Sequence, residues 1–257
     1  MKKKLLVLGM LCFAMVQAFG WGATGHRATG LIAEQYLNAK AKKKIAMILE
    51  QESIAMVSNW MDEIRSDSTY NYATDWHWST IPDGKKYEDV ESIANPDGRL
   101  IMMIEKVTKE LKSGKLTAKQ EKEFLKMLIH MIGDVHQPLH VGKPGDKGGN
   151  DVKLKWFRND SNLHRVWDSE MIDDSKLSYT ELANGIVKPD ALVVKKWQAT
   201  TVRDWALESM GYRPQVYDIG NGNLSYQYGF KYFGIAKMRI LQAGIRMAGV
   251  LNDIYGK

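Results

Sequence analysis

The chain contains a single cysteine, Cys12, which lies among the first twenty positions. A disulfide needs two cysteines and a thiolate metal site usually needs several, so both are excluded from the chain after residue 20. Histidine is also scarce, with six residues in 257. No stretch after residue 20 is apolar for long enough to span a membrane. Any metal site must therefore be built from the few histidines and from the acidic residues.

The first twenty residues have the three parts of a secretory signal peptide. Lys2–Lys4 form a basic start, Leu5–Val16 an apolar stretch, and Ala18–Gly20 a cleavage site with small residues. We therefore predict that residues 1–20 are removed, with cleavage after Gly20, and that residues 21–257 are exported to the periplasm or secreted. The three lysines of this segment account for half of the formal net charge of +6, so residues 21–257 carry +3. A charge of this size is only a weak indication of nucleic-acid binding.

After Trp21 most of the sequence has a helical hydrophobic pattern. Apolar residues at helical spacing predict a helix over Ser53–Ser66. The capping box Thr117–Gln120 predicts the start of a second helix, which Pro138 ends. Ser225 is a candidate N-cap of a long final helix.

Strand signals are sparse. Residues 151–157 (DVKLKWF) alternate in polarity after the turn-forming residues 148–150, and predict one arm of a small β-hairpin. Residues 67–99 contain prolines and glycines that favour loops. The chain has no repeats and no linker, so we predict a mostly α-helical protein, a single compact multi-helix domain with a small β-hairpin.

Two pairs of residues share one spacing, a histidine followed four positions later by an aspartate. They are His130 with Asp134 and His164 with Asp168. Positions i and i+4 lie on one face of a helix, so each pair can direct an imidazole and a carboxylate to one metal ion. The other candidate ligands are His26, Asp62, His77, His140 and the backbone amine and carbonyl that Trp21 would expose after cleavage. At three to four protein ligands per zinc ion, this set suits two or three ions.

The charge of such a cluster indicates its chemistry. Three Zn²⁺ ions against three aspartates leave a net positive site that attracts phosphate. Zinc lowers the pKa of bound water from about 15.7 to about 7, so hydrolysis of a phosphate ester is the natural reaction. Arg65 follows Asp62 by three positions, near the same helix face, and is a candidate for stabilising charge on the phosphoryl oxygens.

Several motifs after residue 20 resemble a known family. They are, in order, WGATGH, NWMDEIR, HMIGDVHQPLH, GGND, NLHRVWD, WALES and AGIRMAGVLN. In this order they are similar to the zinc-dependent, single-strand-specific nucleases and 3′-nucleotidases of fungi, plants and bacteria, which belong with the zinc phospholipases C. The resemblance covers essentially all of residues 21–257 and implies the helical fold of that superfamily. Known fungal and plant members carry disulfides, which this chain lacks.

The resemblance implies three zinc ions, two of which share Asp134. The first is held by Asp62, His77, His130 and Asp134, the second by His140, His164 and Asp168, and the third by the Trp21 amine and carbonyl, His26 and the bridging Asp134. His136 is a neighbour in that pattern and not a ligand.

The resemblance also implies the reaction. A zinc-bound hydroxide would cleave single-stranded DNA, RNA and 3′-nucleotides and leave 5′-phosphates. We expect Asp62 to orient this hydroxide and Arg65 to stabilise the transition state. The family stacks a nucleobase on the aromatic residue at Trp78 and binds it through an aspartate where this chain has Thr80. Asn150, in GGND, is a further candidate substrate contact, and no obligate protein partner is implied.

Two other classes compete with the nuclease. A phospholipase C-type hydrolase would use the same zinc cluster, but such relatives typically end the last pair with glutamate, where this chain has Asp168. They also space the terminal tryptophan further from its histidine than WGATGH does. A carboxylate-bridged di-metal protein expects Glu-x-x-His pairs, and no histidine here has a glutamate three residues before it. The motifs therefore favour the nuclease.

Overall fold

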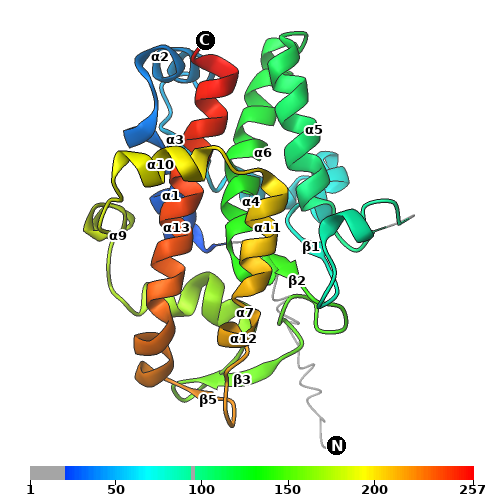
Figure 1. Ribbon diagram of the computed structural model, residues 1–257, viewed down its shortest axis with the longest axis vertical. Coiled ribbons are helices and arrows are strands. Elements are labelled where there is room, and N and C mark those ends of the chain that lie inside the picture. Colours follow the sequence, from blue (N-terminus) through cyan, green and yellow to red (C-terminus); the bar gives the residue numbers. More distant parts are fainter. Residues whose placement is uncertain (1–20, 94–95) are drawn as a thin grey trace, which may run out of the picture.

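The computed structural model describes residues 21–93 and 96–257, which form a mostly helical domain (Figure 1). The predicted signal peptide, residues 1–20, lies outside the described residues. The longer helices are α1 (Ala23–Tyr36), α5 (Leu100–Ser113), α6 (Ala118–His136) and α13 (Tyr226–Tyr255). The shorter ones are α2 (Ala39–Ile48), α3 (Ile54–Val57), α4 (Trp60–Glu63), α7 (Leu163–Arg165), α8 (Met171–Asp173), α9 (Tyr179–Gly185), α10 (Ala191–Gln198), α11 (Val202–Gly211) and α12 (Arg213–Val216). This architecture confirms the predicted fold class.

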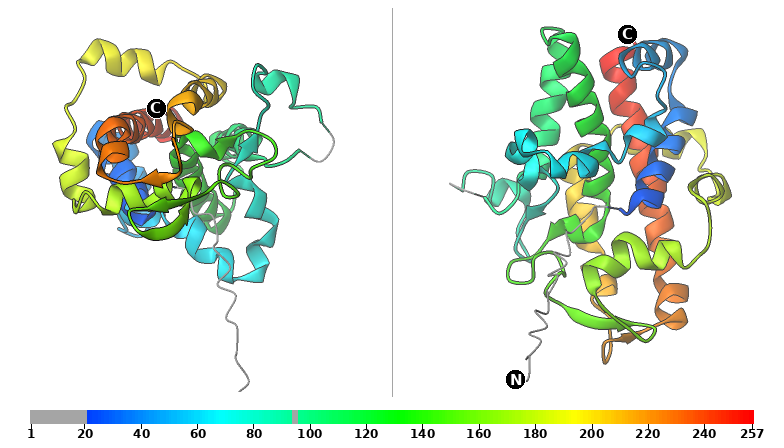
Figure 2. Two further views of the ribbon diagram at one scale, coloured as in Figure 1. Left: turned by 90° about the horizontal axis from the view of Figure 1, so that it is seen from below. Right: turned by 180° about the vertical axis from the view of Figure 1, so that it is seen from behind.

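Helix α13 runs along most of the molecule and packs against α1, α6 and α10. Figure 2 shows α1 on one side of α13 and α10 on the other. Helices α5 and α6 form an antiparallel pair beside α13 (Figure 1). Gly114 ends α5 in the left-handed conformation, with φ 65°, which glycine adopts without a steric penalty. The chain can therefore reverse within a few residues and enter α6.

Helix α6 begins where the capping box predicts. Thr117 accepts a hydrogen bond from the Gln120 backbone N–H, and the Gln120 side chain accepts one from the Thr117 backbone. From Leu125 to His136 every residue of the helix is buried. A helix buried on all sides belongs to the centre of a domain. Its polar residues His130 and Asp134 therefore lie in the interior.

Two arginines of α13 are buried beside the end of α6. Arg239 is 0% exposed and Arg246 is 1% exposed. Both donate hydrogen bonds to the Glu208 carboxylate of α11 at 2.7 Å. Arg239 also donates from Nε to the His136 carbonyl oxygen at 3.1 Å. This network joins α6, α11 and α13 at the turn that carries Asp134.

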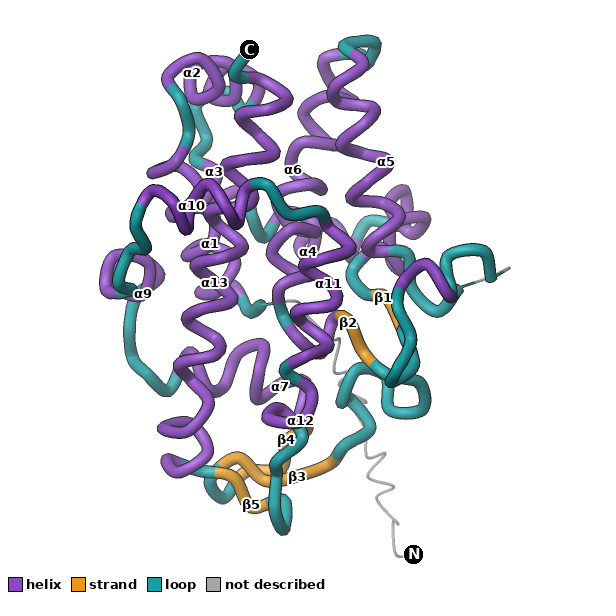
Figure 3. The backbone as a smooth tube through the Cα atoms, viewed as in Figure 1, coloured by secondary structure: helices purple, strands orange, loops and turns teal. Residues whose placement is uncertain are grey.

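The strands form two small sheets (Figure 3). In the first, β1 (Ser79–Thr80) pairs in parallel with β2 (Val141–Gly142). In the second, β3 (Lys153–Trp156) pairs antiparallel with β4 (Asn159–Asn162), so the predicted hairpin is present. A third strand, β5 (Asn223–Leu224), joins β3 in parallel and was not predicted.

The predicted helix over Ser53–Ser66 is wrong as a continuous element. The segment is divided into α3, α4 and the 3₁₀ turn η1 (Ile64–Ser66). The interruption falls at Ser58, whose carbonyl oxygen lies 2.7 Å from His130 Nδ1. Because the Ser58 carbonyl oxygen is paired with the His130 side chain, it does not need a backbone N–H from a following turn of helix. The helix can therefore be interrupted at this residue.

Residues 67–99, predicted to be rich in loops, contain β1 and the 3₁₀ turns η2 (Ser68–Trp76) and η3 (Tyr87–Asp89). Ser225 occupies the N-cap of α13 as predicted, but its side chain makes no capping hydrogen bond within the described chain. Among residues 21–93 and 96–257, no helix is both long and apolar enough to cross a bilayer.

Candidate metal centre and active site

Four side chains from three parts of the fold surround one point. They are Asp62 of α4, His77 at the end of η2, and His130 and Asp134 of α6. His130 Nε2 lies 3.1 Å from His77 Nδ1 and 3.2 Å from Asp134 Oδ2. Asp62 Oδ1 lies 3.8 Å from each of these two imidazole nitrogens. Tetrahedral ligands at about 2.0–2.1 Å from zinc are about 3.3 Å apart, so these spacings suit one zinc-sized ion.

His140, His164 and Asp168 form a second group, with ligand atoms within 4.8 Å of one another. His164 Nε2 lies 2.9 Å from Asp168 Oδ2, and His140 Nε2 lies 3.8 Å from Asp168 Oδ1. The backbone that carries Asp168 is a π-helical turn, η5 (Val166–Glu170), which directly follows α7. Such turns are rare and occur frequently at functional sites.

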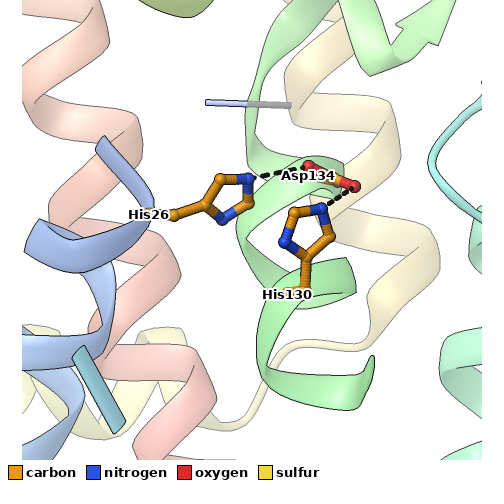
Figure 4. Close-up of side chains that lie close together, drawn as sticks. All are labelled: His26, His130 and Asp134. Atoms are coloured by element: carbon orange, nitrogen blue, oxygen red, sulfur yellow. Dashed lines mark ion pairs between the residues drawn. The ribbon is translucent and has the colours of Figure 1, made fainter. Parts of the chain in front are cut away.

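A third group contains His26 of α1 with His130 and Asp134 of α6. Figure 4 shows the Asp134 carboxylate paired with both imidazoles, and the His26 Nε2 to Asp134 Oδ1 distance is 3.2 Å. The rings of His26 and His130 are stacked with their centroids 4.0 Å apart. Gly133 permits this approach, because a Cβ at that position would lie 2.7 Å from His26 Nδ1.

Several buried polar atoms of these groups make no hydrogen bond with the part of the chain that the structure describes. They include His26 Nδ1 and Asp62 Oδ1. A buried polar atom without a hydrogen bond is costly, by about 1–3 kcal/mol. A cation coordinated by these atoms would remove that cost, so the residues present fit a metal cluster.

Three histidines are held in the tautomer that a metal needs. Nδ1 of His130 lies 2.7 Å from the Ser58 carbonyl oxygen, and Nδ1 of His164 lies 2.7 Å from the Gly148 carbonyl oxygen. His140 Nδ1 lies 2.5 Å from the carbonyl oxygen of His77. An Nδ1–H that donates to a carbonyl leaves the Nε2 lone pair for the ion.

Electrostatics keep the carboxylate at the centre of the site charged. Burial acts to raise the pKa of Asp134, but His130 and His140 hold it well below its usual range. Burial also lowers the pKa of His77 to about 4, so this imidazole stays neutral. For His140 the effect of burial is outweighed by Asp134 and Asp168, which raise its pKa to about 9. The site therefore attracts positive charge, as a proton or as a metal ion.

A cavity of about 570 Å³ borders two of these groups, the one that contains His77 and the one that contains His140 and His164. Its lining includes the ligand candidates His77, His140 and His164. It also includes all three candidate substrate contacts, Trp78, Thr80 and Asn150. Metal ligands and substrate contacts predicted from separate motifs thus share one cavity.

Comparison with known proteins agrees with this geometry. The family model described as S1/P1 Nuclease matches residues 21–256. The chain belongs to the S1/P1 nuclease family. It is similar to Endonuclease 2 of Arabidopsis thaliana, with 27% identity over 98% of this chain and 96% of the relative. Nuclease P1 of Penicillium citrinum is 25% identical over 92% of this chain and 98% of its own length. Nuclease S1 of Aspergillus oryzae is 25% identical over 98% of both chains.

The chain is therefore a nuclease, a hydrolase, and its buried histidine and aspartate groups are suited to binding metal ions. The family match decides between the classes that the motifs left in competition. Neither the phospholipase nor the carboxylate-bridged protein is needed to explain the cluster.

The structure also places the remaining site candidates of the nuclease. Arg65 Nη1 lies 3.6 Å from Asp62 Oδ1, and its side chain is 15% exposed. Trp21 is fully buried, and the next backbone N–H, of Gly22, donates to the Asp168 carbonyl oxygen at 2.6 Å. His136 lies outside the three groups, because its Nδ1 is 2.7 Å from the Ile132 carbonyl oxygen and its Nε2 faces Arg246.

The sequence analysis did not identify two polar side chains that contact the site, Gln137 and Asp97. Gln137 donates from Nε2 to Asp168 Oδ1, and its side-chain oxygen Oε1 accepts from the Leu139 backbone N–H at 2.5 Å. Gln137 lies within the motif HMIGDVHQPLH, so its place in that motif was a signal that could have identified it. Asp97 bonds to Trp78 and Thr80 across the cavity wall. Its segment resembles an ordinary loop, so only the tertiary structure identifies it.

Proposed function

We propose that the nuclease holds three zinc ions, hydrolyses single-stranded DNA and RNA to products that carry 5′-phosphates, and hydrolyses 3′-nucleotides to nucleosides and phosphate. The single observation that supports this best is that three groups of candidate ligands lie together in the interior, and that two of them border one cavity, through His77, His140 and His164, that Trp78 also lines. When bound, zinc is a Lewis acid that makes water more acidic and neutralises charge on a phosphate. The proposed ligands are Asp62, His77, His130 and Asp134 for one ion, His140, His164 and Asp168 for another, and His26, Asp134 and the Trp21 backbone for the third.

Asp62 and Arg65 are the proposed catalytic residues. The Asp62 carboxylate lies against the imidazoles of His77 and His130, so it can accept a hydrogen bond from the attacking water and orient it toward phosphorus. The Arg65 guanidinium next to it can donate to the phosphoryl oxygens as negative charge develops on them.

Trp78 is the proposed base contact. Its indole is only partly buried and borders the cavity next to the ligand His77. A base stacked on an aromatic ring contributes about 1–3 kcal/mol, and stacking needs a base that is not paired in a duplex. This accounts for a preference for single strands. Asn150 and Thr80 offer amide and hydroxyl groups on the same wall.

We further propose that residues 1–20 direct export and that cleavage after Gly20 frees the Trp21 amine. A peptide nitrogen is a poor ligand because its lone pair is delocalised, whereas a free α-amine has a pKa of about 8 and can bind zinc. Export would then complete the third site and keep the precursor inactive inside the cell.

The decisive experiment uses the mature protein, residues 21–257. It is incubated with single-stranded DNA, duplex DNA, RNA, a 3′-nucleotide and phosphatidylcholine, with and without a chelator. We expect chelator-sensitive hydrolysis of the single strands and the 3′-nucleotide, with 5′-phosphate ends on the oligonucleotide products. Cleavage of phosphatidylcholine alone would contradict the proposal and favour a phospholipase. Equal cleavage of duplex and single strands would contradict the role of Trp78.

A further inference from the structure

Asp97 lies on the wall of the cavity, 19 positions after Trp78 in the chain. Its Oδ1 accepts a hydrogen bond from the Trp78 indole Nε1–H at 3.0 Å. Its Oδ2 accepts one from the Thr80 hydroxyl at 2.8 Å. One carboxylate thus fixes both the ring proposed to stack the base and the hydroxyl next to it.

The backbone around Asp97 reinforces this contact. The Thr80 N–H donates to the Asp97 carbonyl oxygen at 2.9 Å, and the Leu100 N–H donates to the Trp78 carbonyl oxygen at 2.9 Å. Gly98 has φ +86°, and a Cβ there would overlap the carbonyl group and ring of Trp78. The segment therefore packs directly on Trp78 at a position that only glycine suits.

We propose that Asp97 positions Trp78 and selects guanine as the base bound there; this inference rests on the proposed nuclease and 3′-nucleotidase activity. A carboxylate has about four lone-pair sites and donates no hydrogen bond. Trp78 and Thr80 occupy one site on each oxygen of Asp97, which leaves one acceptor on each oxygen. Asp97 itself is exposed to solvent, so these acceptors are accessible from the cavity.

Among the bases, guanine presents two adjacent donors, N1–H and the N2 amino group, on its Watson–Crick edge. These two donors match the remaining acceptor sites on the two carboxylate oxygens of Asp97. Adenine and cytosine place a ring acceptor beside their amino group, and uracil places its N3–H between two carbonyl oxygens. Each of these bases would direct an acceptor at an Asp97 oxygen, where no proton is available.

Asp97→Asn separates recognition of the base from positioning of the ring. The asparagine oxygen can still accept from Trp78, and its amide nitrogen can donate to the Thr80 hydroxyl. The face toward the base then offers one acceptor and one donor, which suit adenine. Asp97→Ala removes both functions. Asp151→Asn is the matched control, because Asp151 lines the same cavity, pairs with Lys147 at 3.3 Å and loses the same charge.

The test measures kcat and KM of each protein for 3′-GMP, 3′-AMP, 3′-CMP and 3′-UMP. We expect the native protein to favour 3′-GMP. Asp97→Asn should lower the guanine-to-adenine ratio of kcat/KM by about tenfold or more, as expected for loss of a bidentate base contact. Asp151→Asn should keep the native ratio. Asp97→Ala should raise KM for all four nucleotides more than it lowers kcat.

An active native protein whose ratio is the same in Asp97→Asn would overturn the selection of guanine. Unchanged KM values in Asp97→Ala would overturn the positioning of Trp78. If the native protein hydrolyses none of the four nucleotides but does cut single strands, the nucleotidase part of the proposed function is wrong, and this inference falls with it.

Discussion

Glu208→Gln tests whether one carboxylate stabilises the buried arginine pair behind the active site. Glu208 accepts three hydrogen bonds of 2.7 Å from Arg239 and Arg246, whose side chains are 0% exposed. Removal of one partner from a buried ion pair costs about 3–5 kcal/mol. The Glu208 side chain is itself 37% exposed, and glutamine keeps one acceptor oxygen. We therefore expect a loss of about 3 kcal/mol, the lower end of that range.

The assay is urea unfolding at a fixed free zinc concentration, because metal binding adds to the measured stability. In a separate thermal unfolding experiment, the same loss of about 3 kcal/mol would lower Tm by roughly 6–12 °C for a domain of this size. Glu91→Gln is the matched control, since Glu91 bonds to Arg203 at 2.7 Å with side chains that are 40% and 31% exposed. It should cost at most about 1 kcal/mol. Equal losses in the two variants would refute the argument that burial of the arginines sets the cost.

The same variant gives a prediction for pH. Burial acts to raise the pKa of Glu208, but Arg246 and Arg239 outweigh it and hold the pKa below its usual value. A carboxyl whose pKa is lower in the folded protein stabilises it above that usual value and loses this effect as the pH falls. The stability difference between native protein and Glu208→Gln should therefore shrink below about pH 4.5. A difference that stays constant from neutral to acidic pH would contradict this mechanism.

The remaining predictions concern the site. Metal analysis of the mature protein should find about three zinc ions, and one ion or none would exclude the cluster. Chelation should abolish activity and lower Tm, because zinc that binds only the folded chain adds to its stability. Arg65→Ala should lower kcat by about 10²-fold with zinc content intact, a loss typical of groups that stabilise transition-state charge, and an unchanged kcat would remove Arg65 from the mechanism. Trp78→Ala should raise KM for single-stranded oligonucleotides by about tenfold, a stacking loss of about 1–3 kcal/mol, without a change in zinc content. One extra residue before Trp21 should remove one zinc ion and most activity; equal zinc content and equal rates in both forms would show that the Trp21 amine is not a ligand.

The elements that the sequence predicted well are those governed by local rules. The capping box at Thr117 and the apolar run after it determine α6 without help from the rest of the fold. Alternation in DVKLKWF likewise predicts β3, because a strand buried on one face needs that period. The segment Ser53–Ser66 has equally good helical spacing, yet it is interrupted at Ser58. The contact responsible, with His130, joins residues 72 positions apart and leaves no local signal.

The candidate site shows the same division. The i, i+4 pairs identified His130 with Asp134 and His164 with Asp168, because that spacing alone directs two side chains to one point. The sequence could not show that His164 and Asp168 are joined through a π-helical turn, or that His26 stacks on His130. The stacking depends on how α1 packs against α6, and the π-helical turn has no signature in the spacing of the pair.

The sequence by itself narrowed the side-chain ligands of a metal to the six histidines and the acidic residues near them, since no cysteine follows residue 20. It also determined the family, because the family model matches residues 21–256. Tertiary structure alone decided which histidines share an ion-sized space, because His77 and Asp134 are 57 positions apart in the chain but 3.1 Å apart in the fold. It alone revealed Asp97 beside Trp78, because a hydrogen bond between two loops depends on packing and not on spacing in the chain.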